Sequence, residues 1–344
     1  MVLAVLAPLL LAAGGTGGPG LDTATLPRLL AAAGFVPPAR FKALVIELTP
    51  DAPAPGGFRQ RSFSWKRTAL DRTDWWPAST VKLFAAIVAL EEVERRNFSP
   101  AAEVTFAYPS QLVATTVEAM VRAALTPSDN VAFDRLVELA GFDRLHARLE
   151  TAGFRGTVLL RGYGRRVTYA GTGHGDPRHS PRIELREGRL RTSVPARIGR
   201  RRGGCPDQGN CTTLADLAEA MRRVMLHESL PVRDGFALSA ASVALIRSAL
   251  EADRERGRNV ANGIREAFGR DRPVRLFHKP GFANDWFSDV VFVEPVDPTR
   301  AGGKRWIVAM AGHPGRESLD AAARAVGALL ARDALSPDAT AQSP

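Results

Sequence analysis

The chain has 344 residues, of which 45% are hydrophobic and 24% are charged. This length is enough for a substantial core and is typical of about two domains. The composition is that of a globular protein and excludes a disordered or fibrous chain. The net charge of +10 raises the question of a nucleic-acid partner.

The positive charge is concentrated in one segment. Residues 161–202 contain twelve arginines and three acidic residues, which is a net charge of +9, and the rest of the chain is nearly neutral. A nucleic-acid site would also need aromatic side chains among the arginines, and the segment offers only Tyr163 and Tyr169. We therefore expect no nucleic-acid partner. The segment is either a loop that attracts an anionic substrate or envelope polymer, or simply a solvated arginine-rich loop.

The first residues, "MVLAVLAPLLLAAGG", form an apolar run followed by small residues, which is typical of an export signal although the usual basic start is missing. The run is shorter than the roughly 20 apolar residues that span a bilayer. We predict that residues 1–22 direct export to the periplasm or the medium and that no stable membrane span is present. A lipid-facing anchor and an N-terminal core helix are the alternatives.

Periodicity then predicts the elements in chain order. A short helix, "TLPRLLAAAGF", precedes two strands that begin at Phe41 and Phe58 and are expected to form a hairpin. Helical patterns extend from Trp75 to about Ala152. Residues 153–211 are rich in glycine, proline and arginine, lack periodicity, and predict a long loop.

Two further helices, "TTLADLAEAMRRVML" and "SVALIRSALEA", precede three strands, "VRLFHKPGF", "WFSDVVFVEP" and "RWIVAMAGH", and a last helix. Strands at both ends of the chain predict an α+β fold with one mainly antiparallel, five-stranded sheet. We expect residues 23–74 and 212–335 to build this discontinuous sheet domain. Residues 75–211 are expected to form an all-helical domain that carries the basic loop 153–211, and residues 336–344 a polar tail.

The chain has only two cysteines, Cys205 and Cys211, which lie close together in a glycine-rich stretch. In an exported protein, such a pair predicts a local disulfide. The six histidines are scattered without ligand spacing, so we expect no metal and no cofactor.

The stretch "PASTVKLFAAIVALEEVE", from Pro77 to Glu94, places Ser79 one helical turn before Lys82. Pro77 is tolerated in the first turn of a helix, and the residues after Lys82 are apolar almost all round. Partial desolvation should lower the pKa of Lys82 and let its neutral amine accept a proton from Ser79. The alternative is a lysine that reaches water beside a capping serine.

Two other short motifs follow in order: Ser128, Asp129 and Asn130 in "TPSDN", and Lys279 and Gly281 in "FHKPGF". Each alone would pass as a helix cap or a strand end. Together with Ser79 and Lys82 they resemble the S-x-x-K, S-D-N and K-T-G triplet of class A β-lactamases and penicillin-binding proteins. The resemblance covers roughly Phe41 to Asp333.

This resemblance implies a β-lactamase/transpeptidase-like fold, in which helices flank both faces of the sheet and the active site lies in the cleft beside a helical domain. It implies that Ser79 attacks a carbonyl, that Lys82 takes its proton, and that Ser128 passes a proton to the leaving nitrogen. Lys279 would hold positive charge beside Ser128, and Asn130 would bind the substrate amide.

The backbone amides of Ser79 and of Phe282, which follows Gly281, would form the oxyanion hole. Tyr108 is a candidate for an aromatic wall of the cleft, although core packing is the simpler role for it.

Two departures from the triplet matter. Pro280 replaces the threonine or serine of K-T-G, so that hydroxyl is missing for a substrate carboxylate unless an arginine of the basic loop replaces it. The loop also lacks the E-x-x-L-N pattern whose glutamate activates the hydrolytic water. Glu187 in "EGRL" and Glu184 are weak candidates, since acidic residues among arginines usually pair with them.

The sequence therefore predicts an exported monomeric serine hydrolase that forms an acyl-enzyme at Ser79, with a β-lactam or a related amide or ester as its substrate. The first alternative is a penicillin-binding D,D-peptidase that acts on peptidoglycan-type substrates and deacylates slowly. The second is a non-catalytic envelope-binding protein that keeps the fold and uses the basic loop.

Overall fold

The computed structural model describes residues 20–51, 57–72, 74–168, 171–174, 176–205, 209–252, 259–314 and 316–335. The predicted export segment lies outside the described residues except for its last three positions, and the predicted polar tail lies outside them entirely. Among the described residues, no helix has both the length and the apolar character needed to cross a membrane.

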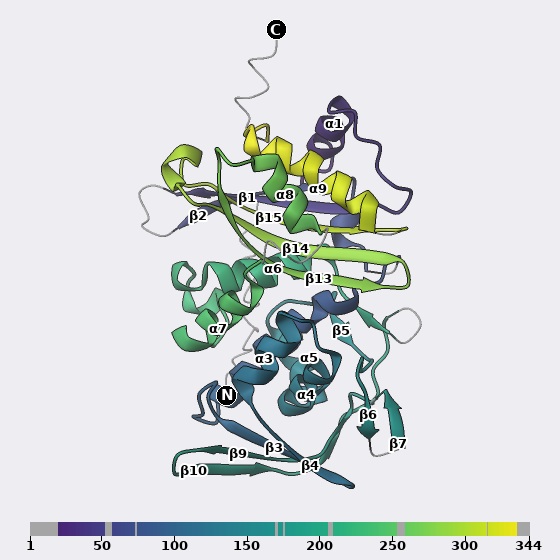
Figure 1. Cartoon of the computed structure of the whole chain (residues 1–344), viewed down its shortest axis with the longest axis vertical. Helices are drawn as coiled ribbons and strands as arrows, with labels where there is room; N and C mark the ends of the chain where they lie inside the picture. Colours follow the sequence, from purple (N-terminus) through teal and green to yellow (C-terminus); the bar gives the residue numbers. More distant parts are fainter. Residues whose placement is uncertain are drawn as a thin grey trace, which may run out of the picture.

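A five-stranded antiparallel sheet forms the centre of the upper part of the molecule (Figure 1), with the strand order β13-β14-β15-β1-β2. Its strands are β1 (Lys42–Pro50), β2 (Phe58–Ser64), β13 (Val274–Ala283), β14 (Trp286–Pro295) and β15 (Arg305–Gly312). The hairpin and the three late strands were predicted from alternation, and the structure confirms both. Because β1 pairs with β15, the two ends of the chain build one sheet.

Helices cover both faces of this sheet, as expected. One face is covered by α1 (Thr25–Ala32), α8 (Val260–Phe268) and α9 (Arg316–Ala331) (Figure 1). The other face is covered by α2 (Lys82–Glu94), α3 (Val117–Leu125), α4 (Asn130–Ala140), α5 (Phe142–Thr151), α6 (Leu214–Met225) and α7 (Ala240–Leu250). Successive side chains of each strand therefore point to opposite faces of the sheet. Val45 and Val308 pack toward α8 and α9, whereas their neighbours Ile46 and Ile307 pack toward α6.

A second sheet corrects the expectation that residues 75–211 are all helical. Four antiparallel strands with the order β10-β9-β3-β4 lie at the end of the molecule remote from the first sheet (Figure 1). They are β3 (Glu103–Tyr108), β4 (Gln111–Thr116), β9 (Arg182–Glu187) and β10 (Leu190–Val194). The segment predicted as a loop thus contributes two of these strands. Its signal was the alternation in "RIELRE", where Ile183 and Leu185 are buried and Arg182, Glu184 and Arg186 are exposed.

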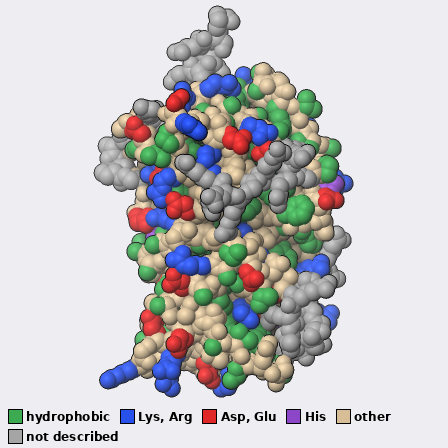
Figure 2. Space-filling model, viewed as in Figure 1, with side chains coloured by type: hydrophobic (Ala, Val, Ile, Leu, Met, Phe, Trp, Pro, Cys, Tyr) green, Lys and Arg blue, Asp and Glu red, His purple; other side chains and the backbone are tan. Residues whose placement is uncertain are grey.

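Short elements complete the chain. They are β5 (Val158–Leu159), β6 (Arg165–Thr168), β7 (Gly171–His174), β8 (His179–Ser180), β11 (Arg197–Ile198) and β12 (Asn210–Cys211), with the 3-10 turns η1 (Thr68–Leu70), η2 (Ala78–Val81), η4 (His227–Ser229), η5 (Val232–Asp234) and η6 (Pro298–Ala301). The predicted disulfide between Cys205 and Cys211 is present, with Cα atoms 5.5 Å apart. On the face drawn in Figure 2, basic and acidic side chains are interspersed, so that face carries no uniformly basic surface.

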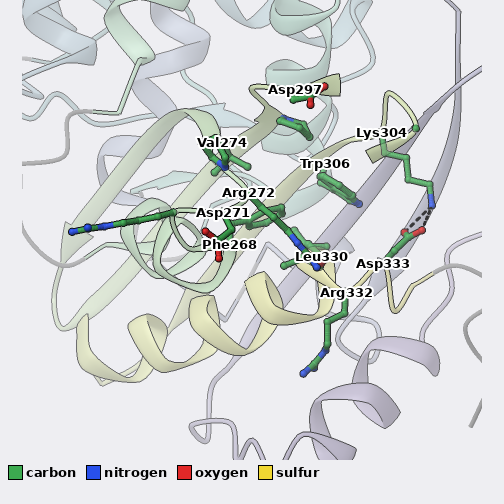
Figure 3. A pocket seen from close by; sticks show the side chains of 15 residues that line it. Phe268, Asp271, Arg272, Val274, Asp297, Lys304, Trp306, Leu330, Arg332 and Asp333 are labelled. Carbon is green, nitrogen blue, oxygen red and sulfur yellow. Dashed lines mark hydrogen bonds and ion pairs between the residues drawn. The ribbon is translucent and has the colours of Figure 1, made fainter. Parts of the chain in front are cut away.

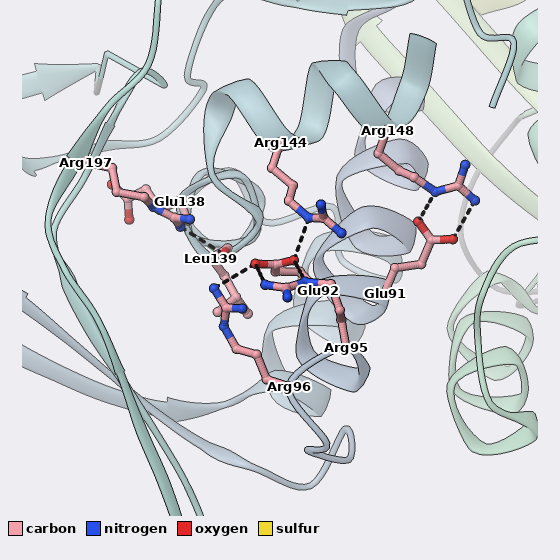
Figure 4. A network of polar contacts seen from close by, with 9 residues as sticks. All are labelled: Glu91, Glu92, Arg95, Arg96, Glu138, Leu139, Arg144, Arg148 and Arg197. Atoms are coloured by element: carbon pink, nitrogen blue, oxygen red, sulfur yellow. Dashed lines mark hydrogen bonds and ion pairs between the residues drawn. The ribbon is translucent and has the colours of Figure 1, made fainter. Parts of the chain in front are cut away.

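The C-terminal half of α2 is held by a buried ion-pair network (Figure 4). Glu92 is 2% exposed and contacts Arg95, Arg96 and Arg144 at 2.9, 2.8 and 2.8 Å. Burial alone would raise the pKa of Glu92, but the hydrogen bonds from Arg95 and Arg144 and the charge of Arg96 outweigh it and lower that pKa. Since Arg144 belongs to α5, the network ties α5 to the helix that begins at Lys82.

Replacing Glu92 with glutamine should lower the free energy of unfolding by about 2 to 4 kcal/mol, because three arginines would lose their shared buried counter-charge. The lowered pKa means that this stabilisation is present at neutral pH and is lost on acidification, so wild type and variant should converge at low pH. Denaturant unfolding followed by circular dichroism measures both effects.

The matched control is Glu118→Gln, which breaks the exposed Glu118–Arg122 pair on α3. Its effect should stay below about 0.5 kcal/mol. Equal losses for the two variants would show that the network contributes no more than a surface pair.

Candidate active site

Ser79 lies on the tight turn η2, immediately before α2, and its neighbours hold that turn firmly. Ala78 has a φ of +47°, which is unusual for a residue with a side chain. The carbonyl oxygen of Ala78 accepts a hydrogen bond from the Tyr163 hydroxyl at 3.0 Å. The carbonyl oxygen of Pro77 accepts from Thr80 Oγ1 at 2.7 Å and from Ser288 Oγ at 3.1 Å. A strained backbone conformation such as that of Ala78 persists only where the surrounding structure holds it, and these hydrogen bonds come from separate elements.

The side chains of the three sequence motifs meet at the hydroxyl of Ser128. Lys279 Nζ, from β13, donates to Ser128 Oγ at 2.9 Å, and Lys82 Nζ, from α2, donates to it at 3.3 Å. Ser128 itself has a φ of +63°. The next residue, Asp129, caps α4 by accepting from the Ala132 amide. The fold therefore brings together groups that are about 150 residues apart in the chain.

Lys82 makes its hydrogen bonds with the S-D-N turn. Its ammonium donates to the Ser128 carbonyl oxygen at 2.5 Å and to Asn130 Oδ1 at 2.6 Å, in addition to Ser128 Oγ. The direct contact with Ser79 Oγ that the sequence led us to expect is not among these bonds. A buried ammonium satisfies its donors with carbonyl oxygens where it can, and the S-D-N turn presents two of them.

Burial is the main influence on both lysines, which are fully inaccessible to solvent. It lowers the pKa of Lys279 to about 7, helped by the charge of Lys82 and opposed by Asp289. It lowers the pKa of Lys82 to about 8, against the opposing charges of Asp129 and Asp134. A neutral amine is therefore accessible near neutral pH, which is the state that a proton acceptor requires.

Gly281 lets β13 approach the Ser79 turn. A Cβ atom at this position would lie 2.5 Å from the Pro77 carbonyl oxygen and 2.9 Å from the Ser79 nitrogen. Any side chain would therefore force the strand and the turn apart. The glycine of the third motif is explained by this contact alone.

A pocket of about 200 Å³ opens beside Ser79. It is lined by Trp76, Ala78, Ser79, Asn130, Arg161, Tyr163, Phe282, Ala283 and Asn284. The predicted residues Ser79, Asn130 and Phe282 thus share one cavity. The part of the lining that the structure describes contains no carboxylate.

Three candidates from the sequence lie elsewhere, all in the four-stranded sheet. Tyr108 is buried and donates its hydroxyl to Glu138 at 2.6 Å, so it forms no wall of the pocket. Glu187 accepts from the Ser99 amide at 2.7 Å, and hydrogen bonds from the side chain and backbone of Ser99 hold the pKa of Glu187 below its usual value. Glu184 pairs with Arg182 at 2.7 Å. Neither glutamate lines the pocket.

Sequence reasoning missed Arg161 and Tyr163 as pocket residues because they follow α5 in the segment predicted as a loop. Asp134 holds this segment against α4 by accepting from the amides of Tyr163 and Gly164 at 2.8 and 2.9 Å. The available signal was Asp134 itself, a carboxylate on the buried side of an amphipathic helix. A buried carboxylate requires donors from some other part of the chain.

A larger cavity of about 1190 Å³ lies on the opposite face of the five-stranded sheet, between the ends of α8 and α9 (Figure 3). Its lining includes Trp306 and the ion pair of Lys304 with Asp333, and none of the motif residues. In the described part of the chain, no cluster of three or more His, Cys, Asp or Glu residues is arranged to hold a metal ion.

The two lowered pKa values can be measured directly, because the chain has only five lysines. In a protein with ¹³C-labelled lysine, two Cε resonances should titrate near pH 7 and 8. Lys82→Met should remove one of the two and raise the pKa of the other, since Lys279 would lose a neighbouring positive charge. Five titrations near pH 10 would contradict the burial argument.

Comparison with known proteins agrees with this geometry. Residues 69–334 match the profile of a family described as the beta-lactamase enzyme family. No curated protein sequence matches the chain. Among solved structures, a beta-lactamase from Sphaerobacter thermophilus DSM 20745 is similar with a TM-score of 0.55 and 18% identity, covering 91% of this chain and 97% of that one.

Two other solved structures are similar to a comparable degree. A beta-lactamase from Desulfarculus baarsii DSM 2075 has a TM-score of 0.56 and 22% identity, with 90% and 99% of the two chains covered. PBP-A has a TM-score of 0.54 and 16% identity, with 90% and 96% covered. A mutant of PBP-A has been solved as an acyl-enzyme complex with penicillin G. At these identities the structures support the fold, and the family profile covers most of the sequence; the chain therefore belongs to the beta-lactamase enzyme family.

Proposed function

We propose that this protein is an exported serine hydrolase that forms an acyl-enzyme at Ser79 with a β-lactam or a related amide or ester. The observation that carries the proposal is the Ser128 hydroxyl held between the amines of Lys82 and Lys279, beside the pocket that contains Ser79. A protein that only binds a ligand has no use for two desolvated lysines, which cost free energy to bury.

In acylation, Ser79 Oγ attacks the substrate carbonyl carbon as its proton passes to the neutral amine of Lys82. The C–N bond then breaks, and Ser128 gives its proton to the leaving nitrogen. The hydrogen bonds from both ammonium groups to Ser128 Oγ supply the replacement proton. The backbone amides of Ser79 and Phe282 would stabilise the oxyanion, which is why the contact made by Gly281 matters.

Slow deacylation is favoured by the composition of the pocket, which supports a penicillin-binding D,D-peptidase type of enzyme as the second candidate. Among the described residues, no carboxylate lines the pocket to activate a water molecule. Burial raises the pKa of Tyr163, and its hydroxyl already donates to the Ala78 carbonyl oxygen, so the phenol is no substitute base. An acyl group on Ser79 should therefore persist.

Export is supported by the disulfide between Cys205 and Cys211, because disulfides persist in oxidising compartments. The apolar N-terminal run agrees with the same destination.

Incubation with penicillin G tests the proposal. We expect one penicillin per chain by intact mass, and the rate of adduct formation should rise with pH up to about 8 as Lys82 loses its proton. The adduct should still be present after one equivalent of antibiotic has been consumed. Rapid loss of many equivalents would identify a β-lactamase instead of the slow enzyme.

Ser79→Ala is the control and should form no adduct at all. If wild type remains unmodified by both penicillin G and an activated ester, the acyl-enzyme proposal is wrong.

Gly281→Ala should fold but lower the acylation rate by about 100-fold, since the added Cβ displaces one oxyanion donor. The control is Gly203→Ala, at an exposed position where a Cβ would meet nothing within 4 Å and the backbone is outside the left-handed region. Stopped-flow measurement of ester acylation compares the two. A Gly281→Ala variant as fast as wild type would remove the oxyanion role from this strand.

A further inference from the structure

The pocket beside Ser79 lies on the acyl side of the reaction centre. Its lining includes Ser79 and Asn130 but neither Ser128 nor Lys279, which serve the leaving group. Once the leaving group departs toward Ser128, the part of the substrate that stays on Ser79 occupies this pocket. The character of the pocket therefore reports on the acyl group.

Among the residues that the structure describes, Arg161 is the only charged one that lines the pocket. Its side chain is exposed, and no carboxylate of the described residues forms an ion pair with it. This contrasts with Arg178 and Arg182 of the same segment, which pair with Asp176 and Glu184. A guanidinium beside a cavity whose described lining holds no acidic residue is available to an anionic ligand.

The backbone of Arg161 is held in place by a buried side chain. Asn210, which is 2% exposed, accepts from the Arg161 amide at 2.8 Å and donates to the Arg161 carbonyl oxygen at 2.9 Å. Asn210 precedes Cys211 of the disulfide. The neighbouring Gly209 lies so close to Trp76 that a Cβ there would be 2.5 Å from the indole ring. Residues 209–211 thus hold Arg161 and Trp76, which form two walls of the pocket. A wall that is already held in place loses less conformational entropy when a ligand binds.

Aromatic side chains supply the remaining walls. Trp76 and Tyr163 are partly buried, whereas Phe282 is 54% exposed, which is unusual for a phenylalanine. They offer apolar surface to the hydrocarbon part of an acyl group, while Arg161 can form two parallel hydrogen bonds with a carboxylate.

We propose that Arg161 binds a carboxylate on the part of the substrate that remains attached to Ser79, so that the preferred acyl donors are anionic on their acyl side. This inference rests on the proposed acyl-enzyme. It assigns to Arg161 a role in specificity and leaves the chemistry to Ser79, Lys82, Ser128 and Lys279.

The test uses two 4-nitrophenyl esters of the same length, the mono-ester of adipic acid and its terminal amide. Acylation rates follow from nitrophenolate release, and intact mass confirms the adduct on Ser79. Wild type should prefer the carboxylate by about tenfold at low salt, the effect of one charge-assisted hydrogen-bond pair at a partly exposed site. Salt should reduce that ratio.

Arg161→Gln should bring the ratio of the two rates to about one, and Arg161→Lys should keep part of the preference because it keeps the charge. The matched control is Arg200→Gln, in the same basic segment but outside the pocket, which should keep the wild-type ratio.

A wild-type ratio near one, or an unchanged ratio in Arg161→Gln, would overturn the assignment. An equal loss in Arg200→Gln would also overturn it, because general attraction by the segment would then explain the preference. If both esters acylate Ser79 at similar rates, only this inference fails. If neither ester modifies Ser79, the proposed function fails with it.

Discussion

Two lysine ammonium groups, both removed from water, share the hydroxyl of Ser128, and the rest of the site depends on this arrangement. Burying an ammonium is unfavourable unless oxygens satisfy its donors. The Ser128 carbonyl, Asn130 Oδ1 and the Pro280 carbonyl do so here. The same desolvation that destabilises these charges makes a neutral amine available near pH 7, so the cost in stability and the capacity for proton transfer have one cause.

This arrangement requires an accurate junction between the five-stranded sheet and the helices below it. Gly281 allows the contact, and Ser288 on the neighbouring strand binds the Pro77 carbonyl from the sheet side. From the helical side, Asp134 positions Tyr163, which in turn binds the Ala78 carbonyl. The ion pairs of Glu92 hold the other end of α2. The Ser79 turn is therefore fixed from several elements at once, which lets its unusual backbone conformation persist.

Membership of the family does not by itself decide the fate of the proposed acyl-enzyme. The sequence shows Pro280 in place of a hydroxyl residue. The structure adds that the described lining of the pocket has an arginine and a tyrosine but no carboxylate. These differences leave the proposed acylating groups unchanged and alter the groups that would recognise the acyl chain and activate water. Specificity and turnover can thus diverge within one fold, because separate segments supply them.

The sequence by itself determined the sheet, most of the helices, the disulfide and the identity of the Ser79, Ser128 and Lys279 motifs, because each is encoded by local periodicity or by a short pattern. It did not reveal β9 and β10, whose alternation is brief and lies among arginines and glycines. Nor did it place Tyr108 and Glu187 in the remote sheet, or Arg161 and Tyr163 in the pocket. Only the tertiary structure decided those positions, because they depend on contacts between distant parts of the chain. The carboxylate of Asp134 accepts hydrogen bonds from the amides of Tyr163 and Gly164, and Gly281 allows β13 to approach the Ser79 turn.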